Sequence, residues 1–225
     1  MFNRTLNALL NLLLPHHCFG CQERGTVLCE RCANERELAD PLDNLNTHAP
    51  FAYRDPVIRR MIWALKYRGG QTIGMALGGR LYDYLLEELA GASEFDGNDP
   101  NFLIIPIPLT RARTRERGFN QAVTIARGLV RRNLARRNGT SNFIIAENIL
   151  RRTRDTGSQT VIKARAKRLA NMRHAFAVID PVIVRGKQII VVDDVITTGG
   201  TMNDARRALT AAGAKIVIAA AVAHG

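Results

Sequence analysis

The chain has 225 residues, 46% of them hydrophobic, with a formal net charge of +12 at pH 7 and a sequence pI near 10.4. That length accommodates one full α/β domain with a small accessory module, and the composition excludes a fibrous or intrinsically disordered protein. The excess of positive charge favours an anionic partner, either phosphates or a nucleic acid.

The first predicted element is a leucine-rich helix at residues 6–14. Arg4 precedes it, as in a signal peptide, but Pro15-His16-His17 follows in place of a small-residue cleavage site. The run is shorter than the ~18 apolar residues of a transmembrane helix, so no transmembrane segment is expected. We expect the helix to dock on the body of the protein or on a partner, with membrane-surface contact as the alternative.

All four cysteines lie in two C-x₂-C pairs, Cys18 with Cys21 and Cys29 with Cys32. Two such pairs can supply the thiolates of a closed tetrahedral zinc site, although the spacer between them is shorter than in common zinc ribbons. A redox dithiol is the alternative use of these residues. Since no other cysteine is available for a disulfide framework, we predict a structural zinc module and a reducing, cytoplasmic location.

Residues 1–49 are assigned to the leucine helix, the zinc-binding module and a linker, and residues 50–225 to one α/β domain. Strand and helix patterns alternate in the second part, which is typical of a parallel sheet flanked by helices. The predicted strands cover residues 51–53, 102–107, 143–149, 175–179, 188–192 and 215–222. The predicted helices cover residues 56–67, 72–90, 119–137, 165–172 and 202–212.

Two features of the helix at residues 56–67 bear on function. Trp63 falls within its apolar pattern and is predicted to lie in the core rather than to stack on a base. Lys66, Tyr67 and Arg68 stand at its end, just before a Gly-Gly pair. They fit a substrate-facing loop and, equally well, a helix C-terminus that attracts cations.

The segment at residues 189–201 contains the strongest chemical pattern. A strand of apolar residues delivers Asp193 and Asp194 at its C-terminal edge, where ligands bind in open parallel sheets. The next five residues turn into a helix, and their glycines and backbone N–H groups can cradle a phosphate. The acids would repel a bare phosphate, so ribose hydroxyls or a shared Mg²⁺ would satisfy them. The loop consists of Thr197, Thr198, Gly199, Gly200 and Thr201.

An earlier strand end is also a candidate anion site. Pro106, Ile107 and Pro108 end the strand at residues 102–107, and a run of arginines follows. Arginine binds phosphate oxygens through two parallel hydrogen bonds, so this segment could cradle pyrophosphate. A proline-rich loop followed by a basic surface helix explains the pattern equally well.

Positive charge is concentrated in residues 111–173, which contain seventeen Lys and Arg against three acids, a net +14 that leaves −2 for the remainder. Charge runs are usually solvated helix faces, but an imbalance of this size favours a surface that binds nucleic acid or pyrophosphate. The arginines assigned to that surface are Arg111, Arg113, Arg115, Arg117, Arg131, Arg132, Arg136 and Arg137.

The segment from Val191 to Thr201 resembles the signature of type I phosphoribosyltransferases: apolar strand, two acids, apolar residues, then a Thr/Gly loop. The resemblance implies a type I phosphoribosyltransferase-like fold for the second domain. It also implies that Asp193 and Asp194 are the catalytic-site acids that hold the ribose hydroxyls of phosphoribosyl pyrophosphate. The residues at 197–201 would then hold its 5-phosphate, with Mg²⁺ as the accompanying ion.

Three further segments, at residues 64–67, 115–121 and 151–154, together with the cysteines, resemble the ComF/GntX family of competence-associated, phosphoribosyltransferase-like proteins. The resemblance implies a role in DNA uptake or utilisation, possible partnership with single-stranded DNA and other uptake proteins, and no particular phosphoribosyl acceptor. Two functions remain open. One is Mg²⁺-dependent phosphoribosyl transfer, and the other is non-catalytic binding of single-stranded DNA with the phosphoribosyl pyrophosphate site as a sensor or unused.

Overall fold

The computed structural model describes residues 16–40, 47–68, 70–90, 101–136, 142–153 and 175–225. Its strands are β1 (Thr47–His48), β2 (Phe51–Ala52), β3 (Asn101–Pro106), β4 (Asn142–Ile145), β5 (Leu150–Arg152), β6 (Phe176–Val178), β7 (Gln188–Ile196) and β8 (Ile216–His224). Its helices are α2 (Glu30–Asn34), α3 (Pro56–Tyr67), α4 (Gln71–Ala90), α5 (Arg111–Arg117), α6 (Gln121–Ala135), α8 (Pro181–Val184) and α9 (Gly200–Ala211).

The main sheet has the strand order β1–β8–β7–β3–β4, and every pairing in it is parallel. The short strand β2 also pairs with β8, so β1 and β2 run along the same edge. The run from Ile189 to Val192 of β7 and nearly all of β8 are apolar, as expected of strands buried on both faces. The sheet therefore confirms the prediction of a parallel α/β architecture.

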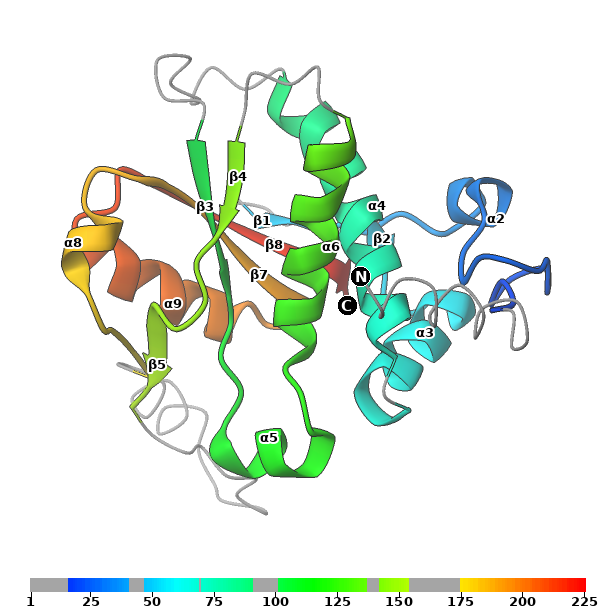
Figure 1. Ribbon diagram of the computed structural model, residues 1–225, viewed down its shortest axis with the longest axis horizontal. Helices are drawn as coiled ribbons and strands as arrows, with labels where there is room; N and C mark the ends of the chain where they lie inside the picture. The colour runs from blue at the N-terminus through cyan, green and yellow to red at the C-terminus, as the bar shows by residue number, and fades with distance from the viewer. Residues whose placement is uncertain (1–15, 41–46, 69, 91–100, 137–141, 154–174) are drawn as a thin grey trace, which may run out of the picture.

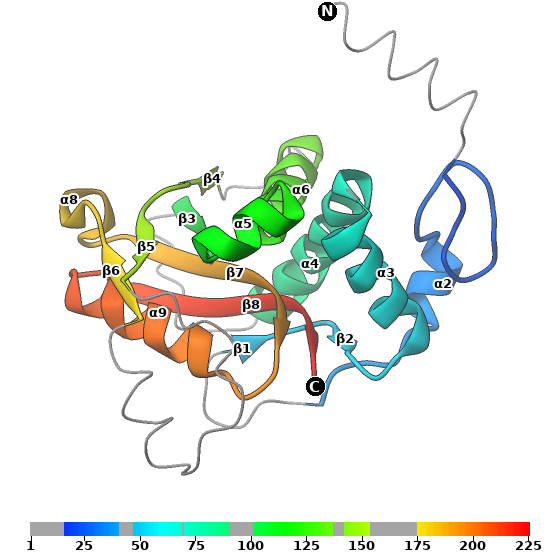
Figure 2. The same cartoon turned by 90° about the horizontal axis from the view of Figure 1, so that it is seen from below.

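Helices cover both faces of this sheet (Figures 1 and 2). Alternate residues of β7 enter two separate cores, because successive side chains of a strand point to opposite faces. Ile190 and Val192 pack with α3, α4 and α6, whereas Ile189 and Val191 pack with α8 and α9. The result is a three-layer molecule with the C-terminal ends of β3 and β7 at one edge.

Glycines allow α4 and α6 to approach closely. A Cβ atom at Gly78 of α4 would lie 2.0 Å from the Ile125 carbonyl oxygen of α6. A Cβ atom at Gly128 of α6 would lie 2.3 Å from the Met75 carbonyl oxygen of α4. Neither position tolerates a side chain without movement of a helix backbone, so the glycines fix the spacing of this layer.

The cysteine module packs directly on the helical layer. Cys18, Val27 and Leu28 belong to the same buried cluster as the inner residues of α3 and α4. Arg60 of α3 donates a hydrogen bond to the Phe19 carbonyl oxygen at 2.9 Å, and Arg80 of α4 forms an ion pair with Glu30. The module and the α/β domain therefore share one core.

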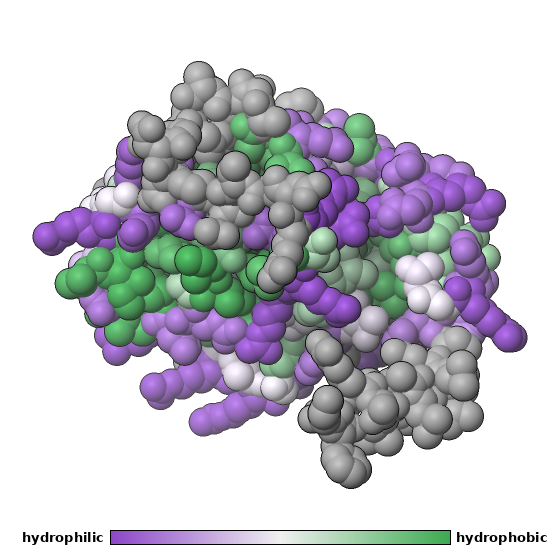
Figure 3. All heavy atoms as spheres, turned by 45° about the horizontal axis from the view of Figure 1, so that its top comes forward, coloured by the Kyte–Doolittle hydropathy of each residue, from purple (hydrophilic) through white to green (hydrophobic). Residues whose placement is uncertain are grey.

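Apolar side chains also reach the surface around α8. Figure 3 shows hydrophobic atoms gathered at the α8 end of the molecule, where Ile179, Val182 and Ile183 are exposed. Within the described part of the chain, no helix combines the length and the apolar character needed to cross a bilayer.

Most predicted elements agree with the structure, and the differences are local. The predicted strand at residues 188–192 continues through both acids to Ile196. The predicted strand at residues 143–149 ends early, because β4 stops at Ile145 and the next strand, β5, begins only at Leu150. The short helices α2 and α8 and the strands β1 and β5 were not predicted, whereas α5 is the basic surface helix that the sequence offered as an alternative. The predicted helices at residues 6–14 and 165–172 lie outside the described residues.

One prediction about a side chain was wrong. Trp63 is not in the core: it is 51% exposed, on the outer side of α3. The apolar residues Ile58, Ile62 and Leu65 fill the inner face of this helix. Trp63 is apolar like these neighbours in the sequence, but it lies on the opposite side of the helix from them. The apolar composition of the segment therefore did not reveal that Trp63 faces outward.

Candidate functional site

Asp193 and Asp194 lie near the C-terminal end of β7, just before the loop that leads to α9. Asp194 is buried, and its Oδ2 atom lies 3.0 Å from the Nζ atom of Lys66, near the end of α3. Asp193 is half-buried, and its Oδ1 atom accepts a hydrogen bond from the Asp194 backbone N–H at 2.8 Å. Thus α3 supplies a cation to the acid pair.

The environment of this pair disfavours a second negative charge. Burial and the neighbouring charge of Asp194 raise the pKa of Asp193 to about 7. The backbone N–H of Asp194 and the cations Lys66 and Arg152 partly oppose that rise in pKa. Near neutral pH the Asp193 carboxyl is therefore divided between its protonated and charged forms, and a ligand that donates hydrogen bonds would favour the charged form.

The loop after β7 presents backbone N–H groups at the start of α9. Gly199 adopts a φ of 70°, a left-handed conformation natural to glycine, and forms the N-cap of the helix. Among the described residues, no side chain caps α9 by a hydrogen bond. The first N–H groups of a helix lack partners within it, and the helix dipole adds positive potential there. With Thr197 and Thr198 exposed beside it, this helix start suits a phosphate.

The end of β3 lies beside the acid pair. Pro106 is in register with Val192, the residue before Asp193, across β3 and β7. The Ile107 N–H extends this pairing by donating to the Val192 carbonyl oxygen at 2.9 Å. The structure therefore brings the proline segment and the Asp193–Thr201 segment, each predicted to lie at a strand end, to one edge of the sheet.

Three residues that sequence reasoning did not select as site residues also reach this edge. The Asn120 Nδ2 atom donates to the Ile107 carbonyl oxygen, and the Arg152 Nε atom donates to the Pro108 carbonyl oxygen, both at 2.9 Å. A lysine at the end of α3 pairs with Asp194. All three stand in the segments that carry the family resemblance, which was the signal available in the sequence. The three residues are Lys66, Asn120 and Arg152.

The predicted basic surface is divided between two places. The four arginines of α5 follow the C-terminal end of β3, whereas the second group lies at the far end of α6 (Figure 1). Arg132 and Arg136 both form ion pairs with Asp83 of α4, at 3.1 and 3.2 Å. Arg131 is exposed, and Arg137 lies outside the described residues. Only the α5 group is near the acid pair.

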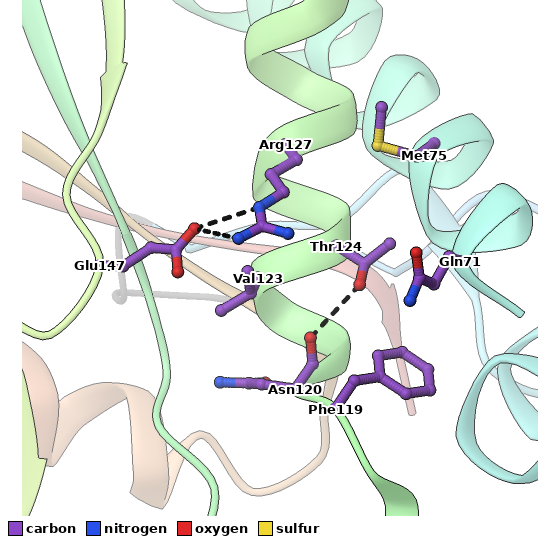
Figure 4. Close-up of a pocket in the computed structure, with 8 residues that line it drawn as sticks. All are labelled: Gln71, Met75, Phe119, Asn120, Val123, Thr124, Arg127 and Glu147. Atoms are coloured by element: carbon purple, nitrogen blue, oxygen red, sulfur yellow. Dashed lines mark hydrogen bonds and ion pairs between the residues drawn. The ribbon is translucent and has the colours of Figure 1, made fainter. Parts of the chain in front are cut away.

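A cavity of about 300 Å³ opens beside the first turn of α6 (Figure 4). Gln71 and Met75 of α4 form one wall, and Phe119 and Thr124 lie between them and Asn120. At the opposite side, Arg127 forms two hydrogen bonds to the Glu147 carboxylate, at 2.9 and 3.1 Å. The side chain of Asn120 connects this cavity to the end of β3.

The four cysteines converge as the sequence predicted. Their Sγ atoms all lie within 4.8 Å of one another, and none forms a disulfide. The Sγ atom of Cys29 lies 3.8 Å from that of Cys18 and 3.7 Å from that of Cys21. A tetrahedral zinc site with Zn–S bonds of about 2.3 Å requires sulfur atoms about 3.8 Å apart. The cluster is therefore compatible with a metal such as zinc.

The thiols of this cluster ionise unequally. Burial opposes ionisation of Cys18, but hydrogen bonds from the backbone of Cys21, Cys29 and Gly20 outweigh it and lower the pKa of Cys18 to about 6. Burial and the neighbouring thiols raise the pKa of Cys32 to about 12. Ionisation of all four thiols at such short distances is unfavourable without a compensating cation, and a divalent metal would supply that charge.

Comparison with known proteins gives one family match and several similar solved structures. The family model described as a phosphoribosyl transferase domain matches residues 117–225, which include the acid pair and the loop before α9. Among solved structures, the hypoxanthine-guanine phosphoribosyl transferase of L. donovani is 12% identical, with a TM-score of 0.37, and covers 66% of this chain and 70% of its own.

Curated relatives extend the match over most of the chain. The "DNA utilization protein YhgH" of Escherichia coli O157:H7 is 32% identical over 192 residues, which are 84% of this chain and 74% of the relative. "Competence protein F" of Haemophilus influenzae is 34% identical over 107 residues, which are 47% of this chain and 43% of the relative. The chain therefore belongs to the ComF family of proteins with a type I phosphoribosyltransferase domain and an N-terminal four-cysteine cluster.

Proposed function

We propose that the protein binds phosphoribosyl pyrophosphate with Mg²⁺ at the C-terminal edge of its sheet and serves the uptake or utilisation of DNA. The main support is the juxtaposition of the Asp193–Asp194 pair with the uncapped N-terminus of α9. The carboxylates would accept hydrogen bonds from the ribose hydroxyls. Residues 197–201 would hold the 5-phosphate through backbone N–H groups and threonine hydroxyls.

The pyrophosphate would lie toward the end of β3. The segment at residues 106–108 is held in place there, and the arginines of α5 follow it. Lys66 already neutralises one oxygen of Asp194 at 3.0 Å, which disfavours a divalent ion at that oxygen. We therefore expect Mg²⁺ to be bound mainly by the phosphate oxygens, with Asp193 the better-placed carboxylate for contact with the ion.

Two roles use this site differently. In phosphoribosyl transfer, an acceptor attacks C1 of the ribose and pyrophosphate leaves, and the protein contributes positioning and charge stabilisation. In the alternative, the protein binds single-stranded DNA and the ligand site acts as a sensor or is unused. The exposed arginines of α5 beside the site favour DNA as a partner in either case. The relatives' names, which refer to DNA utilization and competence, support this partner.

The N-terminal module would bind one structural Zn²⁺. The spacing of the four sulfur atoms fits a closed tetrahedral site, in which no position is open for a substrate. We therefore assign zinc a role in folding and partner contact rather than in chemistry.

The test of the ligand site is calorimetric titration of the protein with phosphoribosyl pyrophosphate and Mg²⁺. The double variant Asp193→Asn with Asp194→Asn should lose detectable binding, because each lost charge-assisted hydrogen bond costs about 1.5–3 kcal/mol. The control is Asp180→Asn, which removes an acid at the start of α8 but keeps an oxygen for the cap. Wild-type affinity in the double variant would refute the site assignment.

The same preparations distinguish the two roles. Pyrophosphate release that depends on an added acceptor supports transfer. Saturable ligand binding without release, together with binding of single-stranded DNA, supports the sensor role. The double variant should retain DNA binding in both cases, since the acid pair repels a nucleic acid.

A further inference from the structure

The outer face of α3 carries an unbroken row of basic and aromatic side chains. Arg59, Arg60, Trp63 and Tyr67 follow one another at steps of one, three and four residues, which places them along one side of the helix. Trp63 is 51% exposed and Tyr67 is 53% exposed. The two rings together form a contiguous exposed aromatic surface, and such a surface is a candidate interaction site.

An arginine lies over each ring. The ring centroids of Trp63 and Tyr67 are 5.7 Å apart. The guanidinium carbon of Arg68 lies 5.0 Å from the Trp63 centroid, and that of Arg117, at the end of α5, lies 5.7 Å from the Tyr67 centroid. We name this surface, made by Arg60, Trp63, Tyr67, Arg68 and Arg117, the α3 strip.

The α3 strip connects the two sites described above. At one end, Arg60 donates to the Phe19 carbonyl oxygen of the cysteine module. At the other end, Lys66, the neighbour of Tyr67, forms the ion pair with Asp194. Figure 2 shows α3 between α4 and the α2 segment of the module. A ligand on the α3 strip would therefore lie against the cysteine module and reach toward the acid pair.

We propose that the α3 strip is a stacking platform for the unpaired bases of a single-stranded nucleic acid. Aromatic rings stack on bases of any sequence, and arginines beside them bind the phosphates. The charge of the α3 strip suits this occupant, since the strip contains three arginines and no acid. This inference deepens the DNA-binding part of the proposed function and rests on it.

Other occupants fit the surface less well. A duplex keeps its bases stacked on one another and cannot offer them to exposed rings. A second copy of this chain would bring the same positive charge, which like-charge repulsion opposes. A membrane-inserted face would place apolar side chains beside the aromatic ones, whereas here the neighbours are arginines.

The chain contains one tryptophan, so its tryptophan fluorescence, excited selectively over that of the tyrosines, reports on Trp63 alone. Titration with unlabelled oligothymidylate should quench that emission, and anisotropy of an end-labelled strand should give the affinity. Trp63→Ala and Tyr67→Ala should each weaken binding by about tenfold, within the range measured for single stacked bases. The slope of log affinity against log salt should stay unchanged, because stacking releases no counterions.

Conservative and remote variants serve as controls. Tyr67→Phe should keep nearly full affinity because it retains the ring. Leu134→Ala, at an exposed apolar position at the far end of α6, should have no effect. Trp63→Ala and Tyr67→Ala both change exposed side chains, so their unfolding temperatures should stay close to that of the wild type.

Three outcomes contradict the inference in distinguishable ways. The platform would be refuted if Trp63→Ala and Tyr67→Ala both bound DNA as tightly as the wild type and if DNA did not quench Trp63 in the wild type. DNA binding by α5 would then still stand. No DNA binding by any preparation at low salt would refute both the platform and the DNA role. Self-association of the wild type that is lost in Trp63→Ala would assign the α3 strip to a contact between copies instead.

Discussion

Half-buried beside Asp194, the carboxyl group of Asp193 has a pKa of about 7, whereas an aspartate in an unfolded chain has a pKa of about 3.9. Between these two values the folded protein keeps a proton that the unfolded chain has released. The contribution of this group to stability therefore falls as the pH rises through that window. A residue that the proposed ligand site would require is thus unfavourable for the unliganded fold, as is common in functional sites.

This conflict gives a prediction for Asp193→Asn. The amide retains the Oδ1 acceptor for the Asp194 N–H but removes the charge. The variant should match the wild type near pH 4 and be more stable by on the order of 1–2 kcal/mol near pH 8, after allowance for partial exposure. Urea denaturation at both pH values measures the difference. Glu116→Gln, an exposed acid of α5, is the control, and a variant less stable than wild type at pH 8 would contradict the assignment.

Single residues show where sequence reasoning reaches its limit. The Asp193–Asp194 pair and its loop are contiguous, so one motif predicted both the acids and their place at a strand end. The ion pair between Lys66 and Asp194 joins helix α3 to strand β7, which are far apart in the sequence. No local pattern encodes that distance, and the sequence left two explanations for Lys66 equally open. Trp63 was misplaced because apolar composition does not reveal which side of a helix faces the core.

At the scale of elements, long segments with a clear period were predictable and short ones were not. The structure confirms α3 at Pro56–Tyr67, where Asp55 caps the first turn through bonds to the Val57 and Ile58 N–H groups. By contrast, α5 has no buried residue, so it has no apolar period to detect. Thr110 at its N-cap and Gly118 at its C-cap set its limits instead.

The contact between α4 and α6 gives a prediction for Gly78→Ala. The added methyl group would meet the Ile125 carbonyl oxygen at 2.0 Å, and the helices must separate to admit it. We expect a loss of roughly 1–3 kcal/mol in the free energy of unfolding. Gly79→Ala is the matched control on the same helix, because its nearest contact would be at 4.0 Å.

Chemical denaturation of the two alanine variants tests this packing. Gly79→Ala should be neutral or more stable than wild type by up to about 1 kcal/mol, since alanine favours helix more than glycine does. Equal stability of the two variants would show that α4 and α6 can separate at little cost. The cavity between Gln71 and Phe119 spans the same helices, so its volume should change only in Gly78→Ala.

At the scale of the whole molecule, the sequence predicted a boundary at residue 49 between the cysteine module and the α/β domain. In the structure the described residues of these two parts share one hydrophobic core. Leu28 and Cys32 are buried in the same cluster as Met61 and Leu77 of α3 and α4. A ligand bound on the α3 strip would lie on the α/β domain and against the cysteine module. Composition changes mark a boundary in the sequence, but only the packing shows whether the parts can fold separately.

Because the core is shared, removal of zinc should destabilise the entire protein. Protein purified without added metal should contain about one zinc per chain by elemental analysis. Chelation should lower the temperature of a single calorimetric transition, since Cys18, Cys29 and Cys32 are buried against the helical layer. Zn²⁺ should restore the original transition, whereas a reductant alone should not. An unchanged transition after verified zinc loss, or absence of zinc with paired disulfides, would contradict a structural metal and favour a redox role for the thiols.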